Sequence, residues 1–469
     1  MPLGCCYITQ NFNFVAGGSL NDIAISIARA NDGALTVVGN FSRPAPGNPT
    51  RNRDCGVMRL LPEGAGYDKS FAAPNGFRTL ALDLAGDNAD DCDDVAVLAD
   101  GSTWIAGVTR DTAVTGATGS GFVTRLLPNG KVDSNFFADG VFLLNNDLPQ
   151  GVSVISSVAD VQVDSAGRVL VAGNIRRGIA PNVSDRGVLL RFLSDGTLDS
   201  EFGTGGFVQL ADFNPPTVLI YHLSQDSQGR VLVFDTTTSA FPGTPTVVIF
   251  RLLDSGAPDT SFGTGMTALG GGGRGFVQRC RFFGTVHLDS SDRILAACLA
   301  STTPPPAGQG QLIRLLPNGL VDLNFGSAGV TPVAFEYNAI GTPIGESDFP
   351  SQILTQPDGK ILVTGTHYAA VAADWGTRDV GVQRLFSNCT PDLSFGQNRS
   401  ASLFRFQGRN QRQETVSAAI LEPNGRMIIV GSLSRAPVFG GSNEIDFLVM
   451  AVRTATPKLP EMMFADSFE

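Results

Sequence analysis

Apolar and polar residues alternate along most of this chain in short runs, and turns that contain glycine separate the runs. The phrases "VQVDSAGRVLVAG" (161–173), "ILTQPDGKILVTG" (353–365) and "AILEPNGRMIIVG" (419–431) share one design. Each has alternating apolar residues, a glycine turn and then a β-branched run, a pattern that predicts a β-hairpin. No segment sustains an apolar period of 3.6 residues, so we expect almost no helix.

A second phrase follows each hairpin and begins with an arginine. It reads "RLLPNGKVDSNF" from Arg125 and "RLLPNGLVDLNF" from Arg314, and the arginine recurs seven times at intervals of 60 to 70 residues. That period suits four strands with their loops, and four-stranded units of this kind build the blades of a β-propeller. We therefore predict an all-β fold, a seven-bladed β-propeller of four-stranded antiparallel blades.

The repeat defines a single propeller over residues 11–453, between an N-terminal arm (1–10) and a C-terminal tail (454–469). The seventh unit has no outer strand after Arg453, whereas "NFNFVAG" (11–17) is similar to an outer strand. We predict that this N-terminal strand completes the last blade and clasps the two ends of the chain. The expected units are 18–82, 83–148, 149–213, 214–270, 271–335, 336–406, and 407–453 with strand 11–17.

In these phrases the chain resembles the delta-60 repeat β-propellers of bacterial, often surface-associated, proteins. Their units carry a "pDGkivvaG" hairpin followed by "R(y/l)…dGslD.sFG", and six copies match in register across about residues 12–453. The resemblance implies the propeller fold and an extracytoplasmic setting, but no particular activity. The final "FADSFE" is also similar to short endings of some secreted bacterial proteins.

Three units depart from the family pattern. The fourth has "VFDTTT" in place of a strand that ends in glycine, the fifth has "SSDR" in its first turn, and the sixth has Cys389 where the others have glycine. We expect Cys389 either to adopt a costly backbone conformation or to relax its turn.

The arginine and an aspartate of the second phrase are eight residues apart in five copies and nine apart in the first. Their midpoint falls on the turn, so Arg125 and Asp133 should face each other on paired strands, with Arg125 half buried. We expect the phenylalanine three residues after each aspartate to fill the space between blades. Enzymes normally build one reaction site, so six copies around a ring favour a structural role over anion binding or proton transfer. The structural repeat comprises Arg59, Asp68, Phe71, Arg125, Asp133, Phe136, Arg191, Asp199, Phe202, Arg251, Asp259, Phe262, Arg314, Asp322, Phe325, Arg384, Asp392 and Phe395.

The charge and the apolar runs argue against two classes of partner. The formal net charge is −11 with no basic cluster, which argues against nucleic acids and anionic membrane surfaces. No run approaches 18 apolar residues, so we expect no membrane-spanning helix. As written, the N-terminus has no basic region of a secretory signal, which leaves a cytosolic protein, a removed signal or a truncated start as alternatives. With the resemblance, we expect an extracellular or cell-surface monomer.

The seven cysteines contain no C-x-x-C pair, so neither a zinc cluster nor a redox pair is indicated. Cys55 with Cys92, and Cys280 with Cys298, are candidate disulfides if the compartment is oxidising. A thiol count with and without reductant would decide between paired and free cysteines.

Short turns lie at one end of the expected blades, and long variable connections lie at the other. Binding residues in such folds usually sit on long loops held by a rigid scaffold. We therefore expect any recognition on this long-loop face or in the central channel. The connections that form the long-loop face are 40–53, 73–92, 108–120, 174–186, 268–282, 300–310, 331–350, 366–379 and 432–445.

Three features of the sequence suggest chemistry, but each has a simpler interpretation. The stretch "DLAGDNADDCDD" (83–94) offers oxygen ligands for calcium but lacks the register of a calcium loop, which favours a solvated acidic loop. "GGGGRG" (270–275) has a phosphate-loop-like spacing, but no helix follows, so we expect a flexible connection. His222, His287 and His367 belong to no catalytic signature and are interpreted as structural or surface residues. No catalytic, cofactor-binding or metal-binding residue is assigned.

Three functions remain open. The first is a non-enzymatic module that binds a protein or glycan through the long-loop face; an apolar or aromatic patch there would favour it. The second is a glycan-active hydrolase or lyase with its site at the channel mouth. A convergent cluster of His, Asp, Glu or Tyr residues with shifted pKa values would favour that alternative. The third is a scaffold with no ligand of its own.

Overall fold

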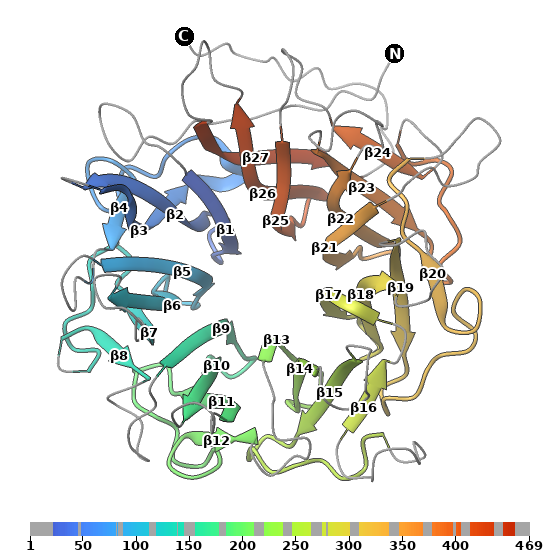
Figure 1. The fold of residues 1–469 in the computed structure, drawn as a ribbon, viewed down its shortest axis with the longest axis horizontal. Coiled ribbons are helices and arrows are strands. Elements are labelled where there is room, and N and C mark those ends of the chain that lie inside the picture. Colours follow the sequence, from blue (N-terminus) through green and yellow to red (C-terminus); the bar gives the residue numbers. More distant parts are fainter. Residues whose placement is uncertain are drawn as a thin grey trace.

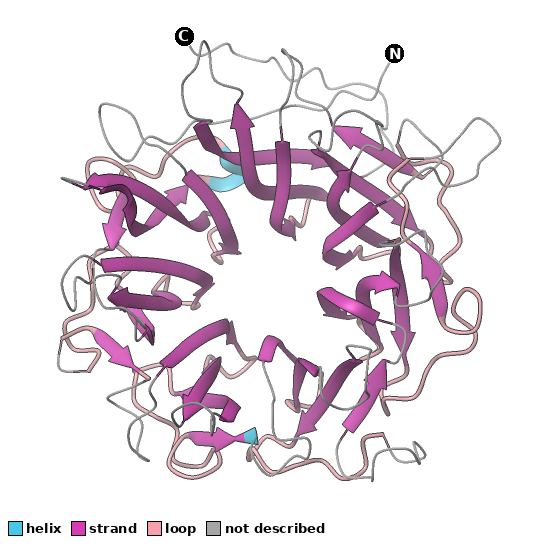
Figure 2. Cartoon of the chain, in the orientation of Figure 1, coloured by secondary structure: helices cyan, strands magenta, loops and turns pink. Residues whose placement is uncertain are grey.

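The structure is a computed structural model of the chain. It describes residues 22–45, 48–80, 82, 88–111, 119–137, 139–144, 155–177, 184–210, 220–237, 246–263, 274–277, 280–300, 309–336, 347–368, 378–396, 400–404, 413–435 and 444–454. These residues form seven twisted blades arranged radially around a central channel (Figure 1), and one parallel pair between Arg378 and Gln413 joins the last two blades into a single sheet. Strands dominate, and helix is limited to short turns such as η1 (Pro62–Gly64), as Figure 2 shows. The predicted seven-bladed propeller and the near absence of helix are confirmed.

The first three blades each contain four antiparallel strands in chain order. The first blade consists of β1 (Asp22–Arg29), β2 (Leu35–Ala45), β3 (Asn48–Leu60) and β4 (Phe77–Leu80). The second consists of β5 (Asn88–Val97), β6 (Thr103–Asp111), β7 (Gly119–Leu126) and β8 (Val141–Leu143). The third consists of β9 (Ile155–Val163), β10 (Val169–Arg177), β11 (Ser184–Phe192) and β12 (Phe207–Gln209).

The remaining four blades repeat this order. The fourth consists of β13 (Ile220–Gln225), β14 (Val231–Thr237), β15 (Thr246–Leu252) and β16 (Arg274–Val277). The fifth consists of β17 (Cys280–Leu288), β18 (Ile294–Ala300), β19 (Gly310–Leu315) and β20 (Val330–Pro332). The sixth consists of β21 (Ser347–Thr355), β22 (Ile361–Tyr368), β23 (Arg378–Leu385) and β24 (Ala401–Phe404). The described part of the seventh consists of β25 (Gln413–Leu421), β26 (Arg426–Arg435) and β27 (Glu444–Arg453).

The core of the molecule is divided among the spaces between blades. Seven hydrophobic clusters lie there, and each draws side chains from two neighbouring blades. One of them joins the two ends of the ring, where Ala24 and Leu35 of the first blade pack with Val430 and Phe447 of the last. The second strand of each blade is therefore covered on both faces, which explains its continuous β-branched runs. Residues 11–17 lie outside the described residues, so the clasp by an N-terminal strand stays a prediction.

Two segment boundaries differ from the sequence prediction. The outer strand of the fourth blade, β16, begins at Arg274, beyond the expected end of that unit at residue 270. The strand β16 pairs with β15 through backbone groups, so the glycine in this segment does not prevent the pairing. The acidic stretch 83–94, expected to be a loop, is a strand from Asn88 onwards because β5 pairs along its length with β6.

The two turns without glycine keep a backbone conformation that normally favours glycine. Cys389 has φ +72° and Asp292, in the "SSDR" turn, has φ +57°. A non-glycine residue in such a region costs about 1–3 kcal/mol. Of the two alternatives for Cys389, the costly backbone conformation is therefore the one observed. Among the described residues, the structure contains no helix of the length and apolarity that crossing a membrane requires.

Candidate functional site

The structure places the repeated arginines against their aspartates. In six blades a guanidinium nitrogen lies 2.7–3.2 Å from the carboxylate, and the arginine side chains are 1–14% exposed. The arginines are thus more deeply buried than the half-buried position expected. The seventh copy, Arg453, is exposed.

Five of these arginines also donate a hydrogen bond to the next blade, which the sequence did not indicate. Arg191 donates from Nη1 to the carbonyl of Asp254 at 2.5 Å, and its guanidinium lies 4.5 Å from the ring centre of Phe202. Arg125, Arg251, Arg314 and Arg384 donate in the same way to Ser194, Pro317, Ser387 and Thr454. The phenylalanines of the repeat are buried between blades. One arginine therefore links its own hairpin to its neighbour, and the stabilising role that we assign to it stays a prediction.

The innermost strand of every blade contains a β-bulge at the same position. The pairing with the second strand skips one residue in each case. A bulged residue is unpaired in the ladder and its strand bends there, which re-aims the side chain. All seven of these residues line a hollow in the central channel. We call them the bulge ring: Ile25, Asp93, Ala159, Tyr221, Gly284, Ser351 and Ser417.

The glycine that ends each predicted hairpin phrase lies opposite this bulge. A Cβ at Gly365 would lie 1.9 Å from the carbonyl oxygen of Phe349, and one at Gly39 would lie 2.2 Å from that of Ile23. Gly107, Gly173 and Gly431 meet the same obstacle at 1.8–2.7 Å. The glycines are therefore required by the close approach of the bulged strand. In the fourth and fifth blades Asp235 and Cys298 pair at this position instead.

The hollow has a volume of about 570 Å³, and residues of the seven innermost strands line it. Its two sides differ in chemistry. Blades two to four supply what we call the acidic wall: Asp93, Asp94, Asp160, Tyr221 and His222. Blades five to seven supply the neutral wall: Gly284, Thr285, Ser351, Gln352, Ser417 and Ala418. Beside the neutral wall is a side recess of about 280 Å³, lined in part by Leu299, Phe349, Pro350 and Val416.

Two carboxylates of the acidic wall hold neighbouring blades together. Asp94 accepts hydrogen bonds from the Ser26 hydroxyl at 2.6 Å and from the Val161 backbone N–H at 2.9 Å. Asp160 accepts one from the Leu223 backbone N–H at 2.8 Å through Oδ2, and the same oxygen lies 2.5 Å from Nδ1 of His222. Asp93, in contrast, makes no hydrogen bond within the described residues.

The acidic wall has shifted pKa values. Burial, with a smaller contribution from the charge of Asp91, raises the pKa of Asp93 to about 7. Burial and the neighbouring charge of Asp160 raise the pKa of Asp94 to about 8. Burial alone would lower the pKa of His222, but Asp160 outweighs it and holds the pKa above its ordinary value. Around neutral pH the wall can therefore both hold and release protons.

The rest of the acidic stretch is engaged in the sheet. Asp91 is bonded by Arg53 at 2.6 Å and Arg110 at 2.9 Å. Within the described residues no group of three or more His, Cys, Asp or Glu side chains could hold a metal ion. Asp83 and Asp87 lie outside those residues, so calcium at the acidic stretch 83–94 stays a prediction.

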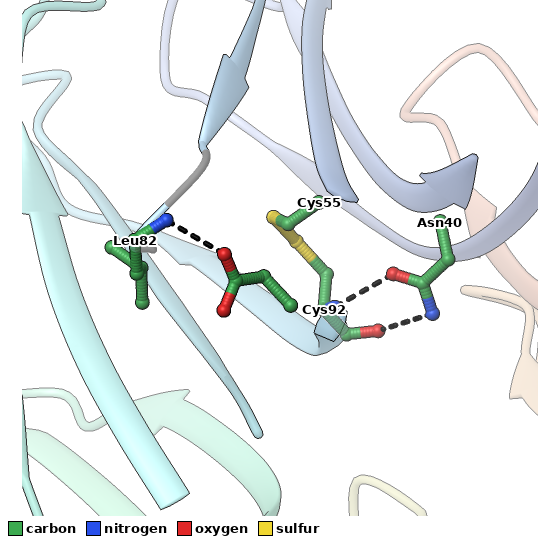
Figure 3. Close-up of a disulfide and its surroundings, with 5 residues drawn as sticks. Asn40, Cys55, Leu82 and Cys92 are labelled. Carbon is green, nitrogen blue, oxygen red and sulfur yellow. Dashed lines mark hydrogen bonds between the residues drawn. A yellow bond between two sulfur atoms is a disulfide. The ribbon is translucent and has the colours of Figure 1, made fainter. Parts of the chain in front are cut away.

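A disulfide joins Cys55 of β3 to Cys92 of β5, with a Cα–Cα distance of 5.1 Å (Figure 3). Beside it, the side chain of Asn40 exchanges two hydrogen bonds with the backbone of Cys92. The disulfide therefore ties the first blade to the second, as one of the two predicted pairs requires. Cys298 is also disulfide-bonded. The side chain of Cys280 lies outside the described residues, so its pairing with Cys298 stays a prediction.

The three histidines occupy different environments. His222 lines the hollow and is partly exposed. His287 lies 2.9 Å from the hydroxyl of Thr355 in the next blade. His367 is buried, with Nδ1 2.6 Å from Asp348 and Nε2 3.5 Å from Glu336. A structural interpretation suits His287 and His367, whereas His222 belongs to the candidate site.

The sequence matches a family model described as "Domain of unknown function (DUF5122) beta-propeller" over residues 167–202 and 356–395. Both segments run from the first turn of a blade to the phenylalanine after the repeated aspartate. These matches and the seven blades support a family of repeat propellers. A search of the curated proteins found no match.

Several solved structures are similar to this chain at low identity. The first is an acylaminoacyl peptidase from Pyrococcus horikoshii (8% identity, TM-score 0.41), where the match covers 90% of this chain but 52% of the peptidase. The second is an ulvan lyase of a polysaccharide lyase family (11%, TM-score 0.45; 92% and 95% of the two chains). The third is an α-L-arabinofuranosidase from Fusarium graminearum (11%, TM-score 0.40; 96% and 98%). Similarities at this level do not bear on the activity of this chain.

Proposed function

We propose that this protein is a non-enzymatic binding module that holds a short glycan in the central hollow. The observation that carries the proposal is the hollow itself. Its volume of about 570 Å³ falls within the range of roughly 300–1,000 Å³ that is common for small-ligand sites. Its walls offer carboxyl, hydroxyl, amide and phenol groups, which supply both donors and acceptors to a ligand rich in hydroxyls. Tyr221 is 51% exposed and presents an aromatic surface to a sugar ring.

The channel is a less suitable site for an extended peptide. Peptides commonly bind by adding a strand to a free sheet edge, through backbone hydrogen bonds. On β9 and β13 the inner-edge N–H groups of Val161 and Leu223 are already bonded by Asp94 and Asp160. The connections of the long-loop face lie largely outside the described residues, so the proposal rests on the channel.

We further propose that the protein is secreted or exposed at a bacterial cell surface and that its repeat is of the delta-60 type. The disulfide between Cys55 and Cys92 supports an oxidising compartment, because cytosolic proteins rarely keep structural disulfides. Detection of the oxidised pair by peptide mapping of protein from its native host would test the location. Recovery of both residues as free thiols would refute it.

A glycan array tests the binding function, with two variants as probes. Ser417→Trp places a large ring in the hollow, and we expect it to lose the binding that the wild-type protein shows. Ser165→Trp places the same ring on an exposed turn at the other end of the blades, and we expect it to bind normally. Circular dichroism checks that both variants fold. Absence of any glycan ligand, or unchanged binding by Ser417→Trp, would refute the proposal.

Hydrolysis or elimination of the bound glycan is the second candidate. It is favoured by the raised pKa of Asp93, about 7, because a carboxyl that is partly protonated at neutral pH can act as a general acid. Glycosidases commonly use two carboxyl groups, however, and both Asp94 and Asp160 are occupied by the neighbouring blade. We therefore favour binding. Release of sugar products by the wild-type protein, and its loss in Asp93→Asn, would instead establish an enzyme.

A further inference from the structure

The charged groups that line the hollow are unevenly distributed. Three carboxylates, those of Asp93, Asp94 and Asp160, belong to the acidic wall. The cationic groups of the lining are His222, which is paired with Asp160, and Arg29, which is exposed at the turn end of β1. The neutral wall opposite carries no charge. The carboxyl groups of the hollow therefore lie on one side, and burial keeps Asp93 partly protonated near neutral pH, so a cation beside Asp93 would favour its charged form.

Two carboxylate groups in this wall lack the partners that carboxylates normally have. Asp93 projects from a bulge and makes no hydrogen bond within the described residues. Asp160 is 2% exposed, and its Oδ1, in contrast to its Oδ2, has no hydrogen-bond partner in the structure. Buried carboxylate oxygens are normally hydrogen-bonded or paired with a cation. The unpaired oxygen of Asp160 is enclosed by the protein, whereas the free carboxyl of Asp93 lines the hollow and is open to a donor that the protein itself does not supply.

We propose that the glycan bound in the hollow carries free amino groups. A protonated amine of one sugar pairs with Asp93, the carboxyl group of the acidic wall that the described residues leave without a hydrogen bond. Tyr221, the bulged residue of the fourth blade, lines the same wall of the hollow, and its exposed aromatic ring adds attraction for an ammonium group. This inference rests on the proposed function and specifies the class of glycan.

The neutral wall is compatible with the rest of such a ligand. Thr285, Ser351, Gln352 and Ser417 offer hydroxyl and amide groups to the uncharged hydroxyls of a sugar. The small bulge residues Gly284, Ser351 and Ser417 leave more space on this side of the hollow than the larger side chains of the acidic wall do. A ligand would therefore lie across the channel, with its cationic side towards blades two to four.

Calorimetry with two matched ligands tests the inference. A glucosamine trisaccharide carries the amines, and the N-acetylglucosamine trisaccharide has the same rings without the charge. We expect the wild-type protein to bind the first at least tenfold more tightly, and more weakly as salt is raised. Asp93→Asn should remove this preference, whereas Asp195→Asn, which removes a carboxylate from an exposed turn, should not. Tyr221→Ser, at another bulge, should lower the affinity for both trisaccharides.

The possible results separate the two proposals. Equal affinity for both trisaccharides, with no effect of Asp93→Asn, overturns the amine inference but keeps a glycan-binding function. Failure to bind either trisaccharide overturns the amine inference, and a glycan array that is also negative overturns the binding function. Binding of a lysine-containing tetrapeptide in place of both saccharides overturns both, because the ammonium would then belong to a peptide.

Discussion

Removing one partner of a repeated ion pair should destabilise the propeller more than removing both. The Nε of Arg251 lies 2.8 Å from Oδ2 of Asp259, and the two side chains are 4% and 8% exposed. Asp259→Ala leaves a buried guanidinium without its counter-charge, a change that costs about 3–5 kcal/mol in other proteins. The double variant Arg251→Met/Asp259→Leu removes both charges of the pair. It loses the hydrogen bond to the Pro317 carbonyl and, like the single variant, those that Asp259 accepts from Ser261, each worth about 0.5–1.5 kcal/mol.

These free energies predict modest but separable shifts in the unfolding temperature. An unfolding entropy of about 2.1 cal/mol/K per residue, over roughly 450 residues, gives close to 1 kcal/mol per degree. Asp259→Ala should therefore unfold about 3–5 °C below the wild-type protein, and the double variant about 1–3 °C below it and above the single variant. Differential scanning calorimetry measures both.

Arg453→Ala is the matched control. This arginine is the seventh copy of the repeat, but it is exposed and no aspartate phrase follows it. Its removal should change stability by less than about 0.5 kcal/mol. If Asp259→Ala shifted the unfolding temperature no more than this control, or if the double variant were as unstable as the single one, the buried charge would not be the cause.

Three further changes test other parts of the structure. Gly365→Ala should destabilise the fold by several kcal/mol, because the added Cβ would lie 1.9 Å from the Phe349 carbonyl oxygen. If the variant unfolded at the same denaturant concentration as the wild-type protein, the close approach would be contradicted. The pair Cys55→Ser/Cys92→Ser should lower stability by about 2–4 kcal/mol, and on reduction the denatured wild-type protein should release two more thiols than the variant does. Burial by itself lowers the pKa of His367, but the carboxylates beside it outweigh burial and raise it. Protonated His367 should then stabilise the fold fully below its ordinary pKa of about 6.5, and this stability should be lost as the pH rises through the raised value. The urea midpoint should fall between pH 6 and 9 more steeply in the wild-type protein than in His367→Gln; parallel profiles would contradict this.

The fold could be predicted because its signals are local. A hairpin such as 353–365 and a turn such as that after Arg314 specify their own strands, and the interval between copies specifies the blade. The sequence also indicated that Arg125 faces Asp133. The sequence did not indicate that the arginine reaches the next blade, because the spacing of residues within one repeat unit carries no information about contacts with another unit.

The candidate site was harder to predict because it depends on register. Asp94, Asp160 and His222 each lie four residues before the residue that opens the first turn of their blade. Aligning the units on these turns would have placed the three side chains together in the ring. The sequence alone assigned Asp94 to a solvated loop and His222 to a structural or surface role. Which residue faces the channel is decided by the bulge, and in five blades the sequence marks the bulge by the glycine opposite it, whereas Asp235 and Cys298 stand there in the other two.

The repeated Arg–Asp pairs and the bulge ring are under different structural constraints. The arginine and the aspartate are the same in six blades because each pair must fit both its own turn and the neighbouring blade. The bulge ring holds Ile, Asp, Ala, Tyr, Gly, Ser and Ser at seven equivalent positions. A bulged residue is unpaired in the ladder, so replacing its side chain leaves the sheet hydrogen bonds in place. The bulge ring can therefore change the chemistry of the channel without changing the fold, which makes it the place where a specific ligand preference can be built.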